Sequence, residues 1–399
     1  MTDNAPSARS RAAVAAQRRL REFHTAPQYM AAQGRAGVFD FSFGNPHEPP
    51  PDGFVAALAA QLEPRTPSWY AYKLSEPAPR QAVAKSLSDW RGMPFDPADV
   101  ALTSGAFGAL AAAFAVTLDP GDEAIYSLPP WFGYESMIAT AGATPVGIPV
   151  RPEDFDPDID AIEAAITPRT RLVIVNSPNN PTGRIHPRAV LERLAAVVDA
   201  ASLRHGRRIW MISDEPYARL LFDGNEFESL TAVYPWTLLT YSYGKVLLTP
   251  GQRVGFLALS PLMPEADRVV MREAIEVAQI AGGWLFPNAL LQHALPDLDV
   301  LSVDLVALQA KRDLFLAGLR DIGYRVHTPQ STFYLLPRSP IDDDEAFCRL
   351  LADEDIFVIS GAICQIPGYF RICFTPTEAT IRDSLPGFAR AFARARDGA

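Results

Sequence analysis

The feature that most constrains the fold is a repeated strand, turn and helix pattern that begins near residue 99. Apolar runs predict strands at 100–103, 123–127, 171–176, 208–213 and 237–242, and helical periodicity predicts helices at 109–118, 158–166 and 190–203. Strands alternating with helices of this length form right-handed crossovers between parallel neighbours. The pattern therefore predicts a largely parallel sheet flanked by helices.

The segments on either side of this pattern have a different character. A strand at 38–43 and helices at 53–62 and 80–90 come before it. After about residue 285, a helical run through 312–319 precedes predicted strands at 324–326, 333–336 and 370–374 and a helix at 380–393. We expect an N-terminal arm with part of a small domain (1–46), a large domain (47–290) and a small α+β domain (291–399).

Composition limits the classes of partner. The chain has 399 residues and a formal charge of -10, which argues against nucleic acid or anionic membranes as the main partner and favours small metabolites. The spacing of Cys348, Cys364 and Cys373 matches neither a zinc site nor a disulfide framework. We expect free thiols, no metal site, no membrane span and a cytoplasmic protein, with an amphipathic arm formed by the Ala- and Arg-rich first twenty or so residues.

Polar turns follow the ends of several predicted strands. Open parallel sheets bind ligands at this carboxyl edge. The turn at 104–108 leads into a helix whose free N–H groups suit a phosphate. The turn at 176–183, Asp214 and Lys245 are expected at the same edge.

Lys245 lies in a small-residue turn between two apolar runs, 237–240 and 254–259, so a strand, a turn and a returning strand are expected. A lysine with a lowered pKa forms Schiff bases with carbonyls. Ser242 and Arg253, close by in the sequence, are suited to hold a phosphate. Together these residues indicate a lysine Schiff base with pyridoxal phosphate.

Three motifs in this order resemble those of the class I/II aminotransferases, which are fold-type I pyridoxal phosphate enzymes. They are Asn176-Ser177-Pro178-Asn179-Asn180-Pro181-Thr182-Gly183, Ser213-Asp214-Glu215-Pro216-Tyr217, and Ser242-Tyr243-Gly244-Lys245 with Pro250-Gly251-Gln252-Arg253-Val254-Gly255. The resemblance runs from Gly44 to Arg371. It implies a mostly parallel seven-stranded sheet flanked by helices in a large domain, plus a smaller α+β domain.

The resemblance also implies roles in holding the cofactor. Lys245 is expected to carry it as a Schiff base and to move the substrate's Cα proton, and Asp214 to pair with its pyridinium nitrogen. Asn180 and Tyr217 are expected to bond its phenolic oxygen, and Trp131 to stack on its ring. The groups expected at its phosphate are the Gly105, Ala106 and Phe107 turn, Ser242 and Arg253.

For the substrate, the resemblance assigns the α-carboxylate to Arg371, with the backbone of Gly44 and the side chain of Asn180 beside it. Tyr70 falls where the family reaches the phosphate of the neighbouring subunit, which implies a homodimer. Gly244, often Ser or Ala in the family, is expected to loosen the turn before Lys245.

Phe107 bears on the substrate, because some aspartate-specific members have a lysine at its place. An aromatic ring does not pair with a second carboxylate, so a neutral or aromatic α-amino acid is expected as donor and a 2-oxo acid as acceptor. Two alternatives keep the cofactor: β-elimination from a cysteine S-conjugate, and decarboxylation coupled to oxidative deamination. A non-catalytic binding module derived from this fold is the third alternative, against which intact Lys245, Asp214 and Arg371 speak.

Overall fold

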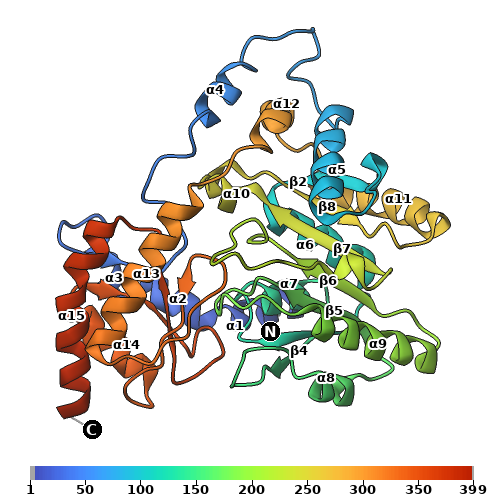
Figure 1. The fold of residues 1–399 in the computed structure, drawn as a ribbon. Helices are drawn as coiled ribbons and strands as arrows, with labels where there is room; N and C mark the ends of the chain where they lie inside the picture. Colours follow the sequence, from blue (N-terminus) through green and yellow to red (C-terminus); the bar gives the residue numbers. More distant parts are fainter. Residues whose placement is uncertain (1–4, 398–399) are drawn as a thin grey trace.

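A seven-stranded sheet forms the centre of the molecule (Figure 1). The computed structural model describes residues 5–397. The strands are β2 (Val100–Thr103), β3 (Glu123–Leu128), β4 (Thr144–Pro149), β5 (Thr170–Asn176), β6 (Trp210–Asp214), β7 (Thr237–Ser242) and β8 (Gly255–Leu259). Their order is β2-β8-β7-β6-β5-β3-β4. β8 is antiparallel to both of its neighbours, β2 and β7, and the other neighbouring pairs in this sheet are parallel. The predicted parallel sheet and the returning strand after Lys245 are confirmed.

Helices cover both faces of this sheet, which is why its strands are apolar on both sides. Leu172 and Ile174 pack towards one face, whereas Val173 and Val175 pack towards the other. The first face is covered by α6 (Gly105–Thr117), α7 (Tyr134–Thr140) and α11 (Glu265–Gly282), and the second by α8 (Ile159–Ala165) and α9 (Arg188–His205). Helices α4 (Phe54–Ala59), α5 (Pro77–Arg91) and α12 (Ala289–Leu298) pack together beside the β2 and β8 edge.

The C-terminal part forms a smaller α+β region, seen on the left of Figure 1. Its antiparallel sheet has the order β11-β12-β9, and a parallel pair joins β1 to β10. These strands are β1 (Phe39–Asp40), β9 (Tyr334–Leu335), β10 (Ile356–Phe357), β11 (Ile359–Ser360) and β12 (Phe370–Cys373). The helices are α13 (Leu305–Ile322), α14 (Asp344–Ala352) and α15 (Glu378–Asp397). The early strand β1 thus ends up beside the C-terminal region.

Two segments differ from the sequence expectation. Tyr324–Val326 forms no strand: Arg325 accepts one backbone hydrogen bond from Arg338 at 2.8 Å, and Tyr324 is buried among aromatic rings. Its apolar character reflects burial and not strand pairing. The sequence reading also missed β4, whose Pro145 and Pro149 argue against a strand; β4 is the edge strand of the sheet, where proline is tolerated.

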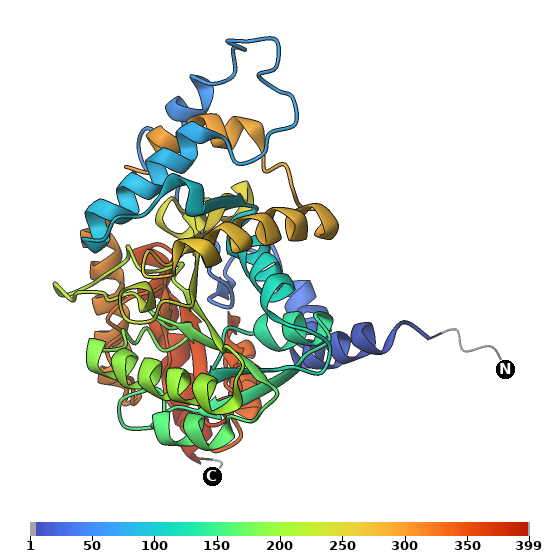
Figure 2. The same cartoon turned by 90° about the vertical axis from the view of Figure 1, so that its right-hand side faces the viewer.

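The N-terminal segment forms three short helices: α1 (Ala8–Ala16), α2 (Arg18–Thr25) and α3 (Pro27–Ala32). Figure 2 shows α1, in dark blue, at the margin of the molecule, and α1 contacts α7. Gln17, between α1 and α2, donates to the carbonyl of Phe132 at 2.8 Å. Among residues 5–397, no helix combines the length and apolar character needed to cross a membrane.

Candidate active site

A row of polar side chains crosses the carboxyl ends of three neighbouring strands. Asn176 at the end of β5 is in register with Asp214 at the end of β6, which is in register with Thr240 on β7. Thr240 Oγ1 donates to Asp214 Oδ1 at 2.7 Å, and Asn176 Nδ2 donates to the Asp214 carbonyl at 2.9 Å. The parallel register thus holds the carboxylate at the sheet edge, as the sequence predicted.

Asp214 is buried, with 3% of its surface exposed, and both of its carboxylate oxygens accept from neutral hydroxyls. The second hydroxyl is that of Tyr134, the first residue of α7. Burial raises the pKa of Asp214 to about 6, although the hydrogen bonds from Tyr134 and Thr240 lower it. A cationic partner would therefore stabilise the ionised form of this buried carboxylate.

Lys245 lies in α10 (Tyr243–Val246), one turn of α-helix that directly follows β7. Ser242 Oγ accepts from the Gly244 N–H at 3.4 Å and caps this turn. A Cβ on Gly244 would come within 2.7 Å of Pro250 Cα. The glycine therefore permits a close backbone approach, and the expected loosening of the turn stays a prediction.

Lys245 Nζ points towards aromatic rings and the Gly44 backbone. It lies 5.6 Å from the centre of the Tyr217 ring and 6.0 Å from that of Phe333. A Cβ on Gly44 would lie 3.7 Å from Lys245 Nζ and 2.5 Å from the Tyr334 hydroxyl oxygen. The glycine therefore brings the 42–45 backbone close to the lysine.

The N-terminus of α6 and Arg253 form a second, cationic side of the site. Arg253 has a positive φ of 49° and donates to the carbonyls of Pro250 at 2.8 Å and Ser104 at 3.1 Å. A Cβ on Gly105 would lie 2.7 Å from Arg253 Nη2, so the glycine lets the guanidinium reach the start of the helix. Free N–H groups and a guanidinium together suit a phosphate.

Arg371 comes from β12 of the smaller antiparallel sheet and is 1% exposed. Its Nη1 donates to Asn180 Oδ1 at 3.2 Å and its Nη2 to the Ser42 carbonyl at 2.7 Å, while its Nε has no partner within residues 5–397. Its guanidinium carbon lies 4.4 Å from the Tyr334 ring centre. This buried cation is held by neutral acceptors and is suited to bind a carboxylate from a ligand.

These groups line one cavity of about 230 Å³. Of the residues expected from the sequence, the lining includes Gly44, Ala106, Phe107, Trp131, Asn180, Asp214, Tyr217, Ser242, Lys245, Arg253 and Arg371. Gly105 contacts the site through Arg253, whereas Tyr70 does not line it: its side chain is 55% exposed and its hydroxyl donates to the Leu62 carbonyl.

Comparison with known proteins gives the family. Residues 36–385 match the family model described as aminotransferase class I and II. The chain belongs to the class I and II aminotransferases. It is therefore a pyridoxal phosphate-dependent transferase of amino groups with the fold-type I architecture.

Several relatives have similar length and fold. Over 329 residues, this aminotransferase is 32% identical to an aspartate/prephenate aminotransferase of Thermus thermophilus, covering 82% of this chain and 84% of the relative. It is also 32% identical to a probable N-succinyldiaminopimelate aminotransferase of Mycobacterium tuberculosis, covering 84% of this chain and 85% of that relative. An aminotransferase structure from Eubacterium rectale superposes with a TM-score of 0.86 at 29% identity, covering 98% of this chain and 96% of that one. The Thermus thermophilus aspartate aminotransferase with maleate gives 0.82 at 28%, covering 97% and 100%.

Four side chains at the site of this aminotransferase were given no role from the sequence: Tyr134, Asn176, Thr240 and Tyr334. Two of them had a usable signal. Asn176 and Asp214 each end a predicted parallel strand, and Thr240 precedes Ser242 by two residues, so both lie on the same face of β7. Tyr334 and Tyr134 had no local signal, because each reaches the site from a distant element.

Proposed function

We propose that this aminotransferase moves the amino group of a neutral or aromatic α-amino acid to a 2-oxo acid, with the cofactor held as a Schiff base on Lys245. The observation that carries this proposal is that three groups line one cavity: the Lys245 amine, the buried carboxylate of Asp214 and the buried guanidinium of Arg371. Both charged groups have neutral partners within the protein, which supports charged partners from the cofactor and the substrate.

The residues present fit pyridoxal phosphate. A protonated pyridine nitrogen is a cation that would pair with Asp214 and lower the pKa that burial has raised. The phosphate would be held by Arg253, Ser242 and the N–H groups of Ala106 and Phe107. Trp131 would stack on the ring, and the Asn180 and Tyr217 side chains, which line the same cavity, would hydrogen-bond its phenolic oxygen. When bound, this cofactor supplies an electron sink for the substrate's Cα.

The protein's own groups then place the substrate and move its proton. Arg371 would bind the α-carboxylate through its unpartnered Nε–H and through the Nη hydrogens that do not bond Asn180 and Ser42, next to the Gly44 backbone. Lys245 Nζ would take the proton from Cα. The buried position of Arg371 strengthens its attraction for the carboxylate.

The substrate class rests on the side of the cavity formed by Phe107, Trp131 and Phe132. The Phe107 and Trp131 rings pack edge to face with centres 4.7 Å apart. None of the three carries a charge that would pair with a second carboxylate, so the pocket favours apolar side chains. The proposed amino donor thus differs from the aspartate in the names of the Thermus relatives.

We also infer a homodimer in which Tyr70 completes the partner's site. Tyr70 is exposed and outside its own cavity, and Tyr72 and Phe286 beside it are 86% and 47% exposed with ring centres 4.9 Å apart. Such an aromatic surface is typical of subunit contacts. The free thiols of Cys348, Cys364 and Cys373 support a reducing, cytoplasmic location.

The function is tested by adding single amino acids to the pyridoxal phosphate-loaded protein without any oxo acid. We expect the absorbance band of the lysine-linked cofactor to disappear as one oxo acid forms per site, and no such band in Lys245→Ala. If the band persists while product accumulates over many turnovers, the enzyme is an eliminating lyase or an oxidative deaminase. If no neutral or aromatic amino acid changes the spectrum, the proposed class of donor is wrong.

A further inference from the structure

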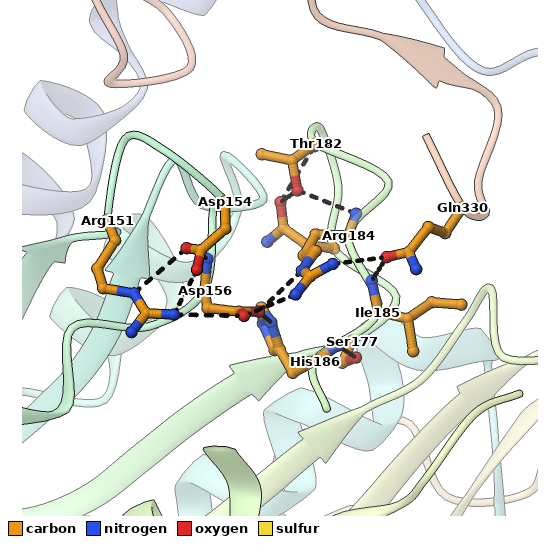
Figure 3. Close-up of polar contacts among 10 residues, drawn as sticks. Arg151, Asp154, Asp156, Ser177, Thr182, Arg184, Ile185, His186 and Gln330 are labelled. Carbon is orange, nitrogen blue, oxygen red and sulfur yellow. Dashed lines mark hydrogen bonds and ion pairs between the residues drawn. The ribbon is translucent and has the colours of Figure 1, made fainter. Parts of the chain in front are cut away.

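A buried ion cluster lies next to the turn that carries Asn180, outside the cavity (Figure 3). Its centre is Asp156, which is 2% exposed. Arg184 binds both oxygens of Asp156, from Nε at 2.9 Å and from Nη2 at 2.7 Å. His186 Nδ1 lies 3.2 Å from Asp156 Oδ1, and Arg151 Nη2 lies 3.5 Å from Oδ2. The reaction proposed above uses none of these four side chains.

Arg184 also reaches a segment that is far away in the sequence. Its Nη1 donates to Gln330 Oε1 at 3.2 Å, and Figure 3 shows its guanidinium between Asp156 and Gln330. The Ile185 N–H donates to the same oxygen at 3.1 Å, and the Gln330 N–H donates to the Gly183 carbonyl at 3.0 Å. Gln330, in the segment 327–331, is therefore bonded to three consecutive residues, 183–185, of the segment 179–185.

The two bonded segments each lead to a residue that holds Arg371. Asn180 lies four residues before Arg184 and accepts from Arg371 Nη1, and Tyr334 lies four residues after Gln330 with its ring 4.4 Å from the guanidinium carbon. The contact of Arg184 with Gln330 thus joins the segments that carry Asn180 and Tyr334, the two walls around Arg371. A small displacement of a binding group weakens a bidentate contact with a ligand strongly.

We propose that Asp156 is a positioning residue of the substrate-carboxylate site: by holding Arg184 against Gln330 it fixes the Asn180 and Tyr334 walls around Arg371. This inference rests on the proposed role of Arg371 in binding the substrate. Asp156 acts through other residues and touches neither substrate nor cofactor. Its carboxylate is required because a buried guanidinium held by a bidentate partner keeps one orientation.

The test compares Asp156→Asn with Asp154→Asn. Asp154 belongs to the same cluster but pairs with Arg151, and its asparagine variant keeps an acceptor for the Asp156 N–H. For each loaded variant, the rate of the amino-acid half-reaction is measured against the concentration of the amino acid that reacts in the screen above. Pyridoxal phosphate affinity is measured separately by titrating the cofactor-free protein.

We expect Asp156→Asn to raise the half-saturating amino-acid concentration about tenfold, with a similar limiting rate and an unchanged cofactor affinity. Asp154→Asn should behave as the wild type. Arg184→Lys keeps the charge but loses the fork that joins Asp156 to Gln330, so its half-saturating amino-acid concentration should rise as in Asp156→Asn. If Asp156→Asn does not fold, Arg184→Lys decides the question.

An unchanged half-saturation in the folded variant, or a parallel loss of cofactor affinity, overturns the inference. Arg371→Lys separates the two proposals. If Arg371→Lys weakens amino-acid binding and Asp156→Asn does not, only the role of Asp156 fails. If Arg371→Lys has no effect, the proposed carboxylate site fails, and the role of Asp156 fails with it.

Discussion

Asp214 and Thr240 face each other in register on β6 and β7, and the threonine hydroxyl donates to the aspartate carboxylate at 2.7 Å. Tyr134, from a helix on one face of the sheet, donates to the other oxygen. Two neutral donors orient this carboxylate without cancelling its charge. The arrangement leaves Asp214 ready for a cationic partner and makes its protonation dependent on burial.

The first prediction concerns the pH dependence of stability in the cofactor-free protein. Burial raises the pKa of Asp214 from 3.8 to about 6. A folded-state pKa above the unfolded value means that the carboxyl group's contribution is fully present below about pH 4 and is lost as the pH rises through about 6, a loss of about 3 kcal/mol. The side chain of Asp214→Asn does not titrate. The difference in unfolding free energy between wild type and this variant, measured by urea titration, should therefore change by about 3 kcal/mol as the pH rises from below about 4 to above about 6. A difference that stays constant with pH would contradict the raised pKa of Asp214.

The second prediction concerns Arg371. Arg371→Lys keeps the positive charge but loses the planar fork, so amino-acid affinity in the half-reaction should fall by about ten- to a hundredfold. Pyridoxal phosphate affinity, measured by titrating the cofactor-free variant, should stay the same, because the side chains proposed to hold the cofactor do not include Arg371. Loss of cofactor affinity alone would instead assign Arg371 to the cofactor.

The third prediction concerns the choice of substrate. Phe107 lines the cavity and lies close to Arg253, whose guanidinium carbon is 5.8 Å from the ring centre. Phe107→Lys should raise the ratio of kcat/KM for aspartate to that for phenylalanine by about tenfold or more, because it adds a cation for the second carboxylate. Phe107→Leu is the control that removes the ring without adding charge. If both variants shift the ratio equally, the size of the residue and not its charge controls the choice.

The fourth prediction concerns the turn that presents Lys245. Gly244→Ala places a Cβ 2.7 Å from Pro250 Cα, a backbone atom that a rotamer change does not move. The free energy of unfolding should fall by about 1–3 kcal/mol, with weaker pyridoxal phosphate binding. Gly251→Ala, in the same connection, is the matched control, because a Cβ there meets nothing within 4 Å. Equal effects of the two substitutions would show that close packing at Gly244 is not the cause.

Much of the fold follows from local sequence patterns. The run at 171–176 is apolar at every inner position, and such runs alternating with helices require a sheet covered on both faces. The same alternation places Asn176, Asp214 and the turn with Lys245 at one edge, since parallel strands end on the same side. Tyr324–Val326 shows the limit of this reasoning: the apolar Tyr324 is buried, but a buried residue need not belong to a paired strand.

The sequence by itself thus determined the layered architecture, the family and the edge at which the polar turns meet. Only the tertiary structure decided which side chains complete the site. Tyr334 reaches the Tyr217 hydroxyl at 3.3 Å across 117 positions, and Tyr134 reaches Asp214 across 80. Contacts over such separations depend on the strand order and on how the C-terminal region packs against the sheet. Both are set by burying apolar surface over the whole chain, which no local pattern encodes.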